Sequence, residues 1–262
     1  MIKRWNAFLV AFALVALCGC STSARSDDVG TSTPSVLDHI LAQLQTQTSP
    51  AQYQIVADAI QASPSLARQM KELAQTGLLA GISIRERTPE EDKTFGAWRS
   101  GSEWIFTPTF LQAQSKRRLF DVVYQDDILP NNMVFVLGHL AYHTDHAAEL
   151  RGKIEALKRQ TSGERTERAM QYALLRLRDE ASAFTQGWND VVDAAVRDNN
   201  GSSLSARQTA SLVINLRYRS PLLQTARKNS KLLGADGRIE PNDRNLAILM
   251  ETLKNTTVMD VE

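Results

Sequence analysis

Cysteine is nearly absent from this 262-residue chain, and the two that occur, Cys18 and Cys20, lie close to the N-terminus. The residues after Cys20 therefore cannot form a disulfide bond among themselves. An excess of one charge is also lacking, because 30 Lys and Arg residues face 29 Asp and Glu residues, so no nucleic-acid partner is expected. Serine-hydrolase and phosphate-loop motifs are missing as well, which leaves serine hydrolysis and nucleotide chemistry without support.

The first residues follow the pattern of a secretory signal. Lys3 and Arg4 precede a run from residue 5 to residue 17 that is apolar except for Asn6. Spanning a bilayer takes about 20 apolar residues, so this run is too short for a stable transmembrane helix. It predicts export of the chain rather than a membrane-spanning segment.

The signal ends in Leu17-Cys18-Gly19-Cys20, which resembles the bacterial lipobox. The resemblance implies that the Cys20 thiol is acylated and that Cys20 becomes the mature N-terminus, anchored in a lipid bilayer. Residues 21–32 are small and polar, as a flexible tether should be. Ser21 directly after the cysteine resembles the outer-membrane sorting class, so we expect an envelope lipoprotein on the outer membrane, facing the periplasm. An ordinary cleaved signal is the alternative.

Hydrophobic periodicity predicts a mainly α protein with a small β-sheet, an α+β fold. The predicted strands cover residues 81–86, which alternate in polarity, and 103–106, which end at Pro108. Helices are expected at about 36–44, 51–61, 65–75, 130–160, 165–197, 204–218, 221–233 and 241–254.

Three of the four histidines, His139, His143 and His146, fall within eight residues of one predicted helix. Positions i and i+4 lie side by side on a helix, so His139 and His143 can bind one zinc ion together. The turns before them, residues 133–137, are apolar on every side, which predicts a buried helix. His146 lies about 10 Å along the axis from His139, too far for the same ion.

The next predicted helix supplies a third ligand, Glu180, among the small residues Ala181 and Ala183. Small neighbours allow this helix to approach closely and direct the carboxylate inward. His139, His143 and Glu180 would then form a two-histidine, one-glutamate zinc site with an open fourth position. We expect Asp179 and His146 to lie around these ligands.

A strand pair, a buried helix with His-x-x-x-His, and a helix with Glu-Ala-x-Ala follow one another between about residues 80 and 200. This order resembles the minimal domain of gluzincin metallopeptidases. The resemblance implies a zincin-like core, with zinc bound by His139, His143 and Glu180. On this basis the chain divides into a signal peptide (1–19), a tether (20–33), an N-terminal helical subdomain (34–78), a zincin-like domain (79–200) and a C-terminal helical segment (201–262).

The sequence departs from the family motif, His-Glu-x-x-His, at Leu140, which replaces the glutamate that acts as general base. Loss of a positioned base costs about 10²–10⁴-fold in rate. Asp145 and Glu149 lie on other faces of the helix and do not replace it. No catalytic residue is therefore assigned.

Three interpretations stay open. A non-hydrolytic zincin-like lipoprotein could bind a peptide, a peptidoglycan fragment or a protein partner, for instance as an immunity or inhibitor protein. An active zinc metallopeptidase would need an unusual base, such as Glu103, expected on the edge strand, or a residue on a loop. A structural envelope lipoprotein would hold its histidines in the core without any metal.

Overall fold

The computed structural model describes residues 34–88, 91, 96–114, 129–159, 165–217, 220–228 and 231–255. The N-terminal segment, with the predicted signal, the tether and Cys20, lies outside the described residues. The described chain is mainly helical with one three-stranded mixed sheet, which confirms the predicted α+β class. The elements are α1 (Val36–Gln47), α2 (Pro50–Ala62), α3 (Pro64–Gln75), β1 (Gly81–Ile84), β2 (Ala97–Ser100), β3 (Glu103–Phe106), α4 (Pro108–Gln114), α5 (Asn132–Arg159), α6 (Arg165–Asp198), α7 (Ala206–Asn215), α8 (Ser220–Lys228) and α9 (Asp243–Asn255).

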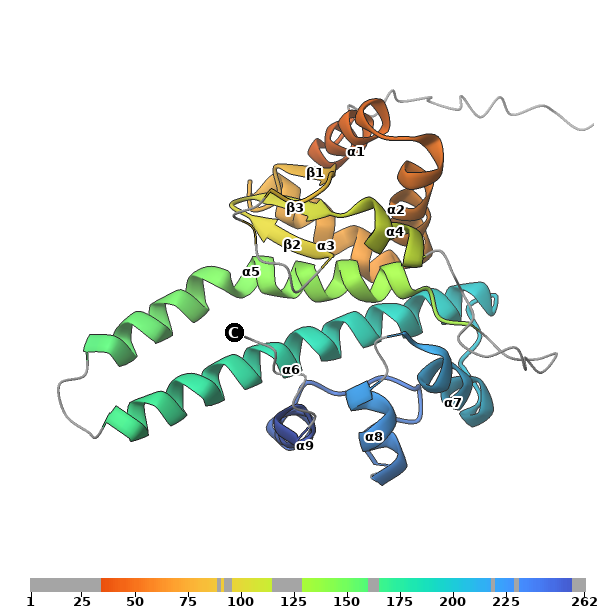
Figure 1. The fold of residues 1–262 in the computed structure, drawn as a ribbon. Helices are drawn as coiled ribbons and strands as arrows, with labels where there is room; N and C mark the ends of the chain where they lie inside the picture. The colour runs from red at the N-terminus through yellow and green to blue at the C-terminus, as the bar shows by residue number, and fades with distance from the viewer. Residues whose placement is uncertain are drawn as a thin grey trace, which may run out of the picture. The chain divides into compact units, whose positions relative to one another are not determined.

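Serine caps define the starts of the first three helices. Ser35 and Ser49 each form a capping box with the third residue of the helix, and Ser63 accepts the backbone N–H of Leu66. Pro50 and Pro64 occupy first helical positions, where a missing N–H carries no penalty. The three helices contact one another, and α2 and α3 also contact α5 (Figure 1).

The sheet has the order β1-β3-β2, with β1 parallel and β2 antiparallel to β3. Alternation along β3 turns Trp104 and Phe106 toward the main hydrophobic core. The Trp104 indole donates a 2.9 Å hydrogen bond to Thr144 Oγ1, which fixes the sheet against α5. The helix α4, which starts at Pro108, was not predicted, because a proline that ends a strand can equally open a helix.

The helices α5 and α6 run side by side through the middle of the described chain (Figure 1). Their close approach depends on two glycines. A Cβ on Gly187 would lie 2.7 Å from the Phe135 carbonyl oxygen, and one on Gly138 would lie 2.3 Å from a carboxylate oxygen of Asp190. The sequence predicted both helices to within about two residues at each end.

The C-terminal helices complete the other side of α6. The helix α9 packs on α6, and the buried Trp188 indole donates a 2.9 Å hydrogen bond to the Gly237 carbonyl oxygen. Two predicted helices are shorter than expected: α7 ends at Asn215 and α8 at Lys228. Among the described helices, none combines the length and the apolar composition that crossing a membrane requires.

Candidate metal centre

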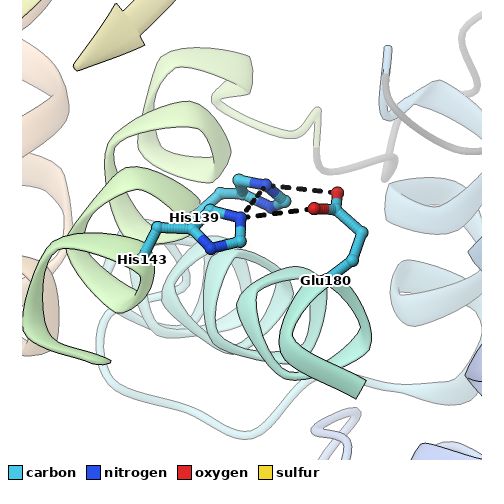
Figure 2. Close-up of side chains that lie close together, drawn as sticks. All are labelled: His139, His143 and Glu180. Atoms are coloured by element: carbon cyan, nitrogen blue, oxygen red, sulfur yellow. Dashed lines mark hydrogen bonds and ion pairs between the residues drawn. The ribbon is translucent and has the colours of Figure 1, made fainter. Parts of the chain in front are cut away.

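Three side chains from α5 and α6 converge on one point (Figure 2). His139 Nε2 and His143 Nε2 lie 3.0 Å apart. Glu180, on the facing helix, places Oε1 3.3 Å from His139 Nε2 and Oε2 3.3 Å from His143 Nε2. The structure thus brings together the three residues that the sequence predicted as ligands, in a group able to hold a metal ion.

Local structure explains this convergence. His139 and His143 are four residues apart on a continuous helix, so their rings project from one face and their centroids lie 4.7 Å apart. The glycine contacts between Gly138 and Gly187 draw α6 toward α5 one residue before His139. Glu180 can therefore reach both imidazoles from the opposite helix.

His143 makes a second contact on its other side. Its Nδ1 lies 2.8 Å from Asp179 Oδ2, and the Asp179 side chain is only 11% exposed. Burial disfavours the charged imidazole, but hydrogen bonds to Asp179 and Glu180 outweigh burial and raise the pKa of His143 to about 9. In the metal-free protein at neutral pH, His143 is therefore an imidazolium held between two carboxylates.

His139 has a different environment. Its Nδ1 is buried and has no hydrogen-bond partner, and its ring lies 5.9 Å from that of Phe135. Burial lowers the pKa of His139 to about 4, although the charge of Glu180 acts in the opposite direction. His139 is therefore neutral at physiological pH and offers a lone pair as it stands.

Glu180 is ionised in this arrangement. Burial alone would raise its pKa, but the two histidines more than compensate and lower it to about 2. A carboxylate beside one neutral and one charged imidazole is a donor set suited to a divalent transition metal once His143 releases its Nε2 proton.

Leu140, which stands at the general-base position of the family motif, packs against the hydrophobic core. Its carbonyl oxygen accepts a 2.7 Å hydrogen bond from Thr144 Oγ1, the same hydroxyl that receives the Trp104 indole. The residue after His139 therefore contributes packing and has no group that can exchange a proton.

The structure also places the remaining predicted residues. The His146 ring stacks on Tyr142 at 4.0 Å, and Tyr142 in turn lies 6.2 Å from His143. Glu103 lies on β3, the central strand of the sheet, so its expected place on an edge strand is wrong. It lines a depression beside α1 with Gln43 and Gly81 and does not belong to the metal-competent group.

The role of Asp179 was only partly foreseen. The sequence placed it near the ligands, but its hydrogen bond to His143 Nδ1 depends on the rotation of α6 relative to α5. The sequence feature that could have predicted this contact is the pair of adjacent acids, Asp179 and Glu180. Two adjacent acids on one helix can contact the two different nitrogens of one imidazole.

Comparison of the chain with protein-family models, with curated proteins and with solved structures finds no match. The fold and the cluster therefore define the class: a mainly helical α+β protein with a His-His-Glu group consistent with an His-x-x-x-His metal site.

Proposed function

We propose that His139, His143 and Glu180 bind a zinc ion in a zincin-like domain that does not hydrolyse its ligand. The observation that carries this proposal is the convergence of three donor side chains from two helices on one point. Two imidazoles and one carboxylate, with a fourth position left for solvent or ligand, match the donor set of open zinc sites.

The spacing of the donors fits this ion. Ligand atoms at zinc bond lengths of 2.0–2.1 Å in a tetrahedron lie about 3.3 Å apart. The two imidazole nitrogens lie 3.0 Å apart, and each has a different oxygen of Glu180 3.3 Å away. With one ligand atom taken from each residue, the three atoms lie within 4.8 Å of one another. Asp179 adds the carboxylate that commonly orients a ligating histidine, since it accepts from Nδ1 and leaves Nε2 directed at the metal position.

A zinc ion there would supply Lewis-acid chemistry. Hydrolysis also requires a positioned proton acceptor, and Leu140 provides none. Leu140 instead packs against the hydrophobic core, which argues against hydrolysis by the route of the gluzincins. We propose that the bound ligand is a peptide, a peptidoglycan fragment or a protein partner, and that an acylated Cys20 holds the domain at the outer membrane.

The gluzincin resemblance gains support from the order of the elements. A small mixed sheet precedes α5, the sheet rests on α5 through Trp104, and α6 carries the third ligand. The order agrees with the strand pair, buried helix and glutamate-bearing helix of the resemblance, with α4 added between the sheet and α5.

A metal-free ion-pair cluster is the competing interpretation, and one observation favours it. His143 lies 2.8 Å from Asp179 and 3.3 Å from Glu180, so a protonated ring satisfies both acids without an ion. Such a cluster would stabilise the packing of α6 on α5 and would bind no metal.

Elemental analysis of the chain from Ser21 onward, purified without chelator, separates the two. We expect about one zinc per chain in the wild type and none in Glu180→Ala. The control is Glu167→Ala, which removes an exposed acid from the same helix and should keep its zinc. Absence of zinc even after zinc is added would leave the ion-pair cluster as the account.

The absence of hydrolysis is tested in the same protein. Peptide cleavage by the zinc-loaded wild type, lost in His143→Ala, would overturn the non-hydrolytic assignment. Cleavage that appears only in Leu140→Glu would support it, because that change restores the family motif.

A further inference from the structure

Arg99 lies on the edge strand β2 above α5. In the antiparallel register it is the partner of Trp104, so both side chains stand on the same face of the sheet. Trp104 hydrogen-bonds Thr144 on α5, which shows that this face is turned toward that helix. Arg99 is exposed at the edge of the sheet and lies close enough to Arg151 on α5 for that charge to act on it.

Arg151 lies on the same stripe of α5 as Thr144, seven residues further on and about 10 Å along the axis. Its Nε donates to the Ala147 carbonyl oxygen at 3.3 Å, which turns the guanidinium back toward the sheet. Only Ala147 and Ala148 occupy the intervening turn of this stripe. The two arginines therefore face one space above α5, from the sheet and from the helix.

Neither arginine has an acidic partner among the described residues, although the neighbouring cations do. Lys153 pairs with Glu149 at 2.5 Å and Lys158 pairs with Glu155 at 2.9 Å, both within α5. Partial burial, together with the charge of Arg151, lowers the pKa of the Arg99 guanidinium. Two like charges thus lie near enough to interact, and neither has an acidic partner among the described residues.

We propose that Arg99 and Arg151 form a binding site for a phosphate group. Two planar guanidinium groups offer several N–H donors in fixed directions, and a phosphate has several oxygens that accept such paired bonds. Its charge of about −2 also balances two arginines better than a single carboxylate does. The site is separate from the metal centre, since Arg151 lies about 12 Å along α5 from His143.

The test is a titration of the full chain with inorganic phosphate. Binding is measured by isothermal calorimetry and by the NMR signals of the arginine Nε–Hε groups. We expect saturable binding that weakens at least about tenfold in Arg99→Gln and in Arg151→Gln. Lys158→Gln is the matched control, because it removes the same charge from the same helix, and it should bind as the wild type does.

Vesicles with phosphatidic acid, whose headgroup is a phosphomonoester, distinguish a lipid headgroup from a free phosphate as the source. Binding of vesicles that requires both arginines would assign the headgroup, and binding of inorganic phosphate alone would assign a soluble phosphate compound. A linear response without saturation, or equal weakening in Lys158→Gln, would overturn the site. None of these outcomes depends on zinc, so the two proposals fail or hold independently.

Discussion

The two halves of the α5–α6 pair differ sharply in burial. In the inner half, α5 buries every residue from Asn132 to Gly138, and α6 buries most residues from Ala181 to Ala195. In the outer half, Leu157 is the one buried residue of α5 beyond Thr144, and α6 has none before Ala181 among those described. Two continuous helices therefore pass from core to solvent along their length.

The His-His-Glu cluster lies at the boundary between these halves. The side chains of His139, His143 and Glu180 are 20%, 28% and 45% exposed. Packing on the inner side fixes the ring positions, and exposure on the outer side gives an ion or ligand access. A site built wholly in either half would lack one of these properties.

The largest effect is expected at His143. His143→Ala should weaken zinc binding more than about a hundredfold, beyond the effect of losing only an orienting partner. With chelator present it should also lower the free energy of unfolding by about 1–3 kcal/mol, because the poorly exposed Asp179 loses its partner.

His146→Ala is the control for this change, since His146 is on the same helix but contacts Tyr142 instead. Calorimetric zinc titration and urea unfolding measure both effects. Equal losses in the two variants would contradict the assignment of His143 as a ligand.

The pH dependence of stability tests burial in the inner half, through Asp190. It is fully buried, and burial, opposed by hydrogen bonds from Ser65 and Gln186, raises its pKa to about 6. A folded pKa above the unfolded value of about 3.8 means that the stabilising contribution is present at low pH. That contribution is lost as the pH rises through about 6, at a cost on the order of 3 kcal/mol.

Asp190→Asn should therefore gain stability relative to the wild type as the pH rises from 4 to 7. Urea unfolding with chelator across this range measures the difference. Glu155→Gln in the outer half should show a constant difference from the wild type between pH 5 and 7, because its pair with Lys158 keeps the pKa of Glu155 low. If the stability difference between Asp190→Asn and the wild type does not change with pH, burial does not raise the pKa of Asp190.

A third prediction concerns Asp179, which lies beside the metal-competent cluster at the boundary between the two halves. Asp179→Asn keeps the size of the side chain but weakens the hold on His143 Nδ1, so we expect a 10–100-fold loss of zinc affinity, the range found for such partners. The variant Asp145→Asn, at an exposed acid near His146, should leave zinc affinity unchanged. If both variants bind zinc like the wild type, Asp179 does not orient a ligand.

The smallest effects are expected at two glycines, one in each half, where the same substitution compares the packing of the two halves directly. Gly187→Ala places a Cβ 2.7 Å from the Phe135 carbonyl oxygen and should cost about 1–3 kcal/mol. Gly152→Ala, on the outer half of α5, meets nothing within 4 Å and should stabilise by roughly 0.5–1 kcal/mol, because alanine favours the helix. Thermal unfolding measures both, and destabilisation by Gly152→Ala would mean that the outer half is packed.

Much of the fold follows from local patterns. Helical periodicity placed α5 and α6 closely, because both segments are far too long for strands and contain no proline or other helix-breaking cluster. The pairing of His139 with His143 required only the helical repeat. The helix α4 was missed because the same proline suits the end of a strand and the start of a helix.

Other features depend on tertiary packing and were beyond reach from the sequence. The contacts at Gly138 and Gly187 set the distance between the helices, and the rotation of α6 decides that Asp179 meets Nδ1 while Glu180 meets Nε2. The space between Arg99 and Arg151 depends on strand register and on how the sheet lies over α5. The division into domains and the lipid anchor stay predictions.

X-ray absorption at the zinc edge tests the central claim most directly. We predict a first shell of two imidazole nitrogens and one or two oxygens at about 2.0–2.1 Å, with one imidazole lost in His139→Ala. A shell of water oxygens alone, or a spectrum unchanged in His139→Ala, would show that the cluster does not bind zinc and would leave His143, Asp179 and Glu180 as a metal-free ion-pair network.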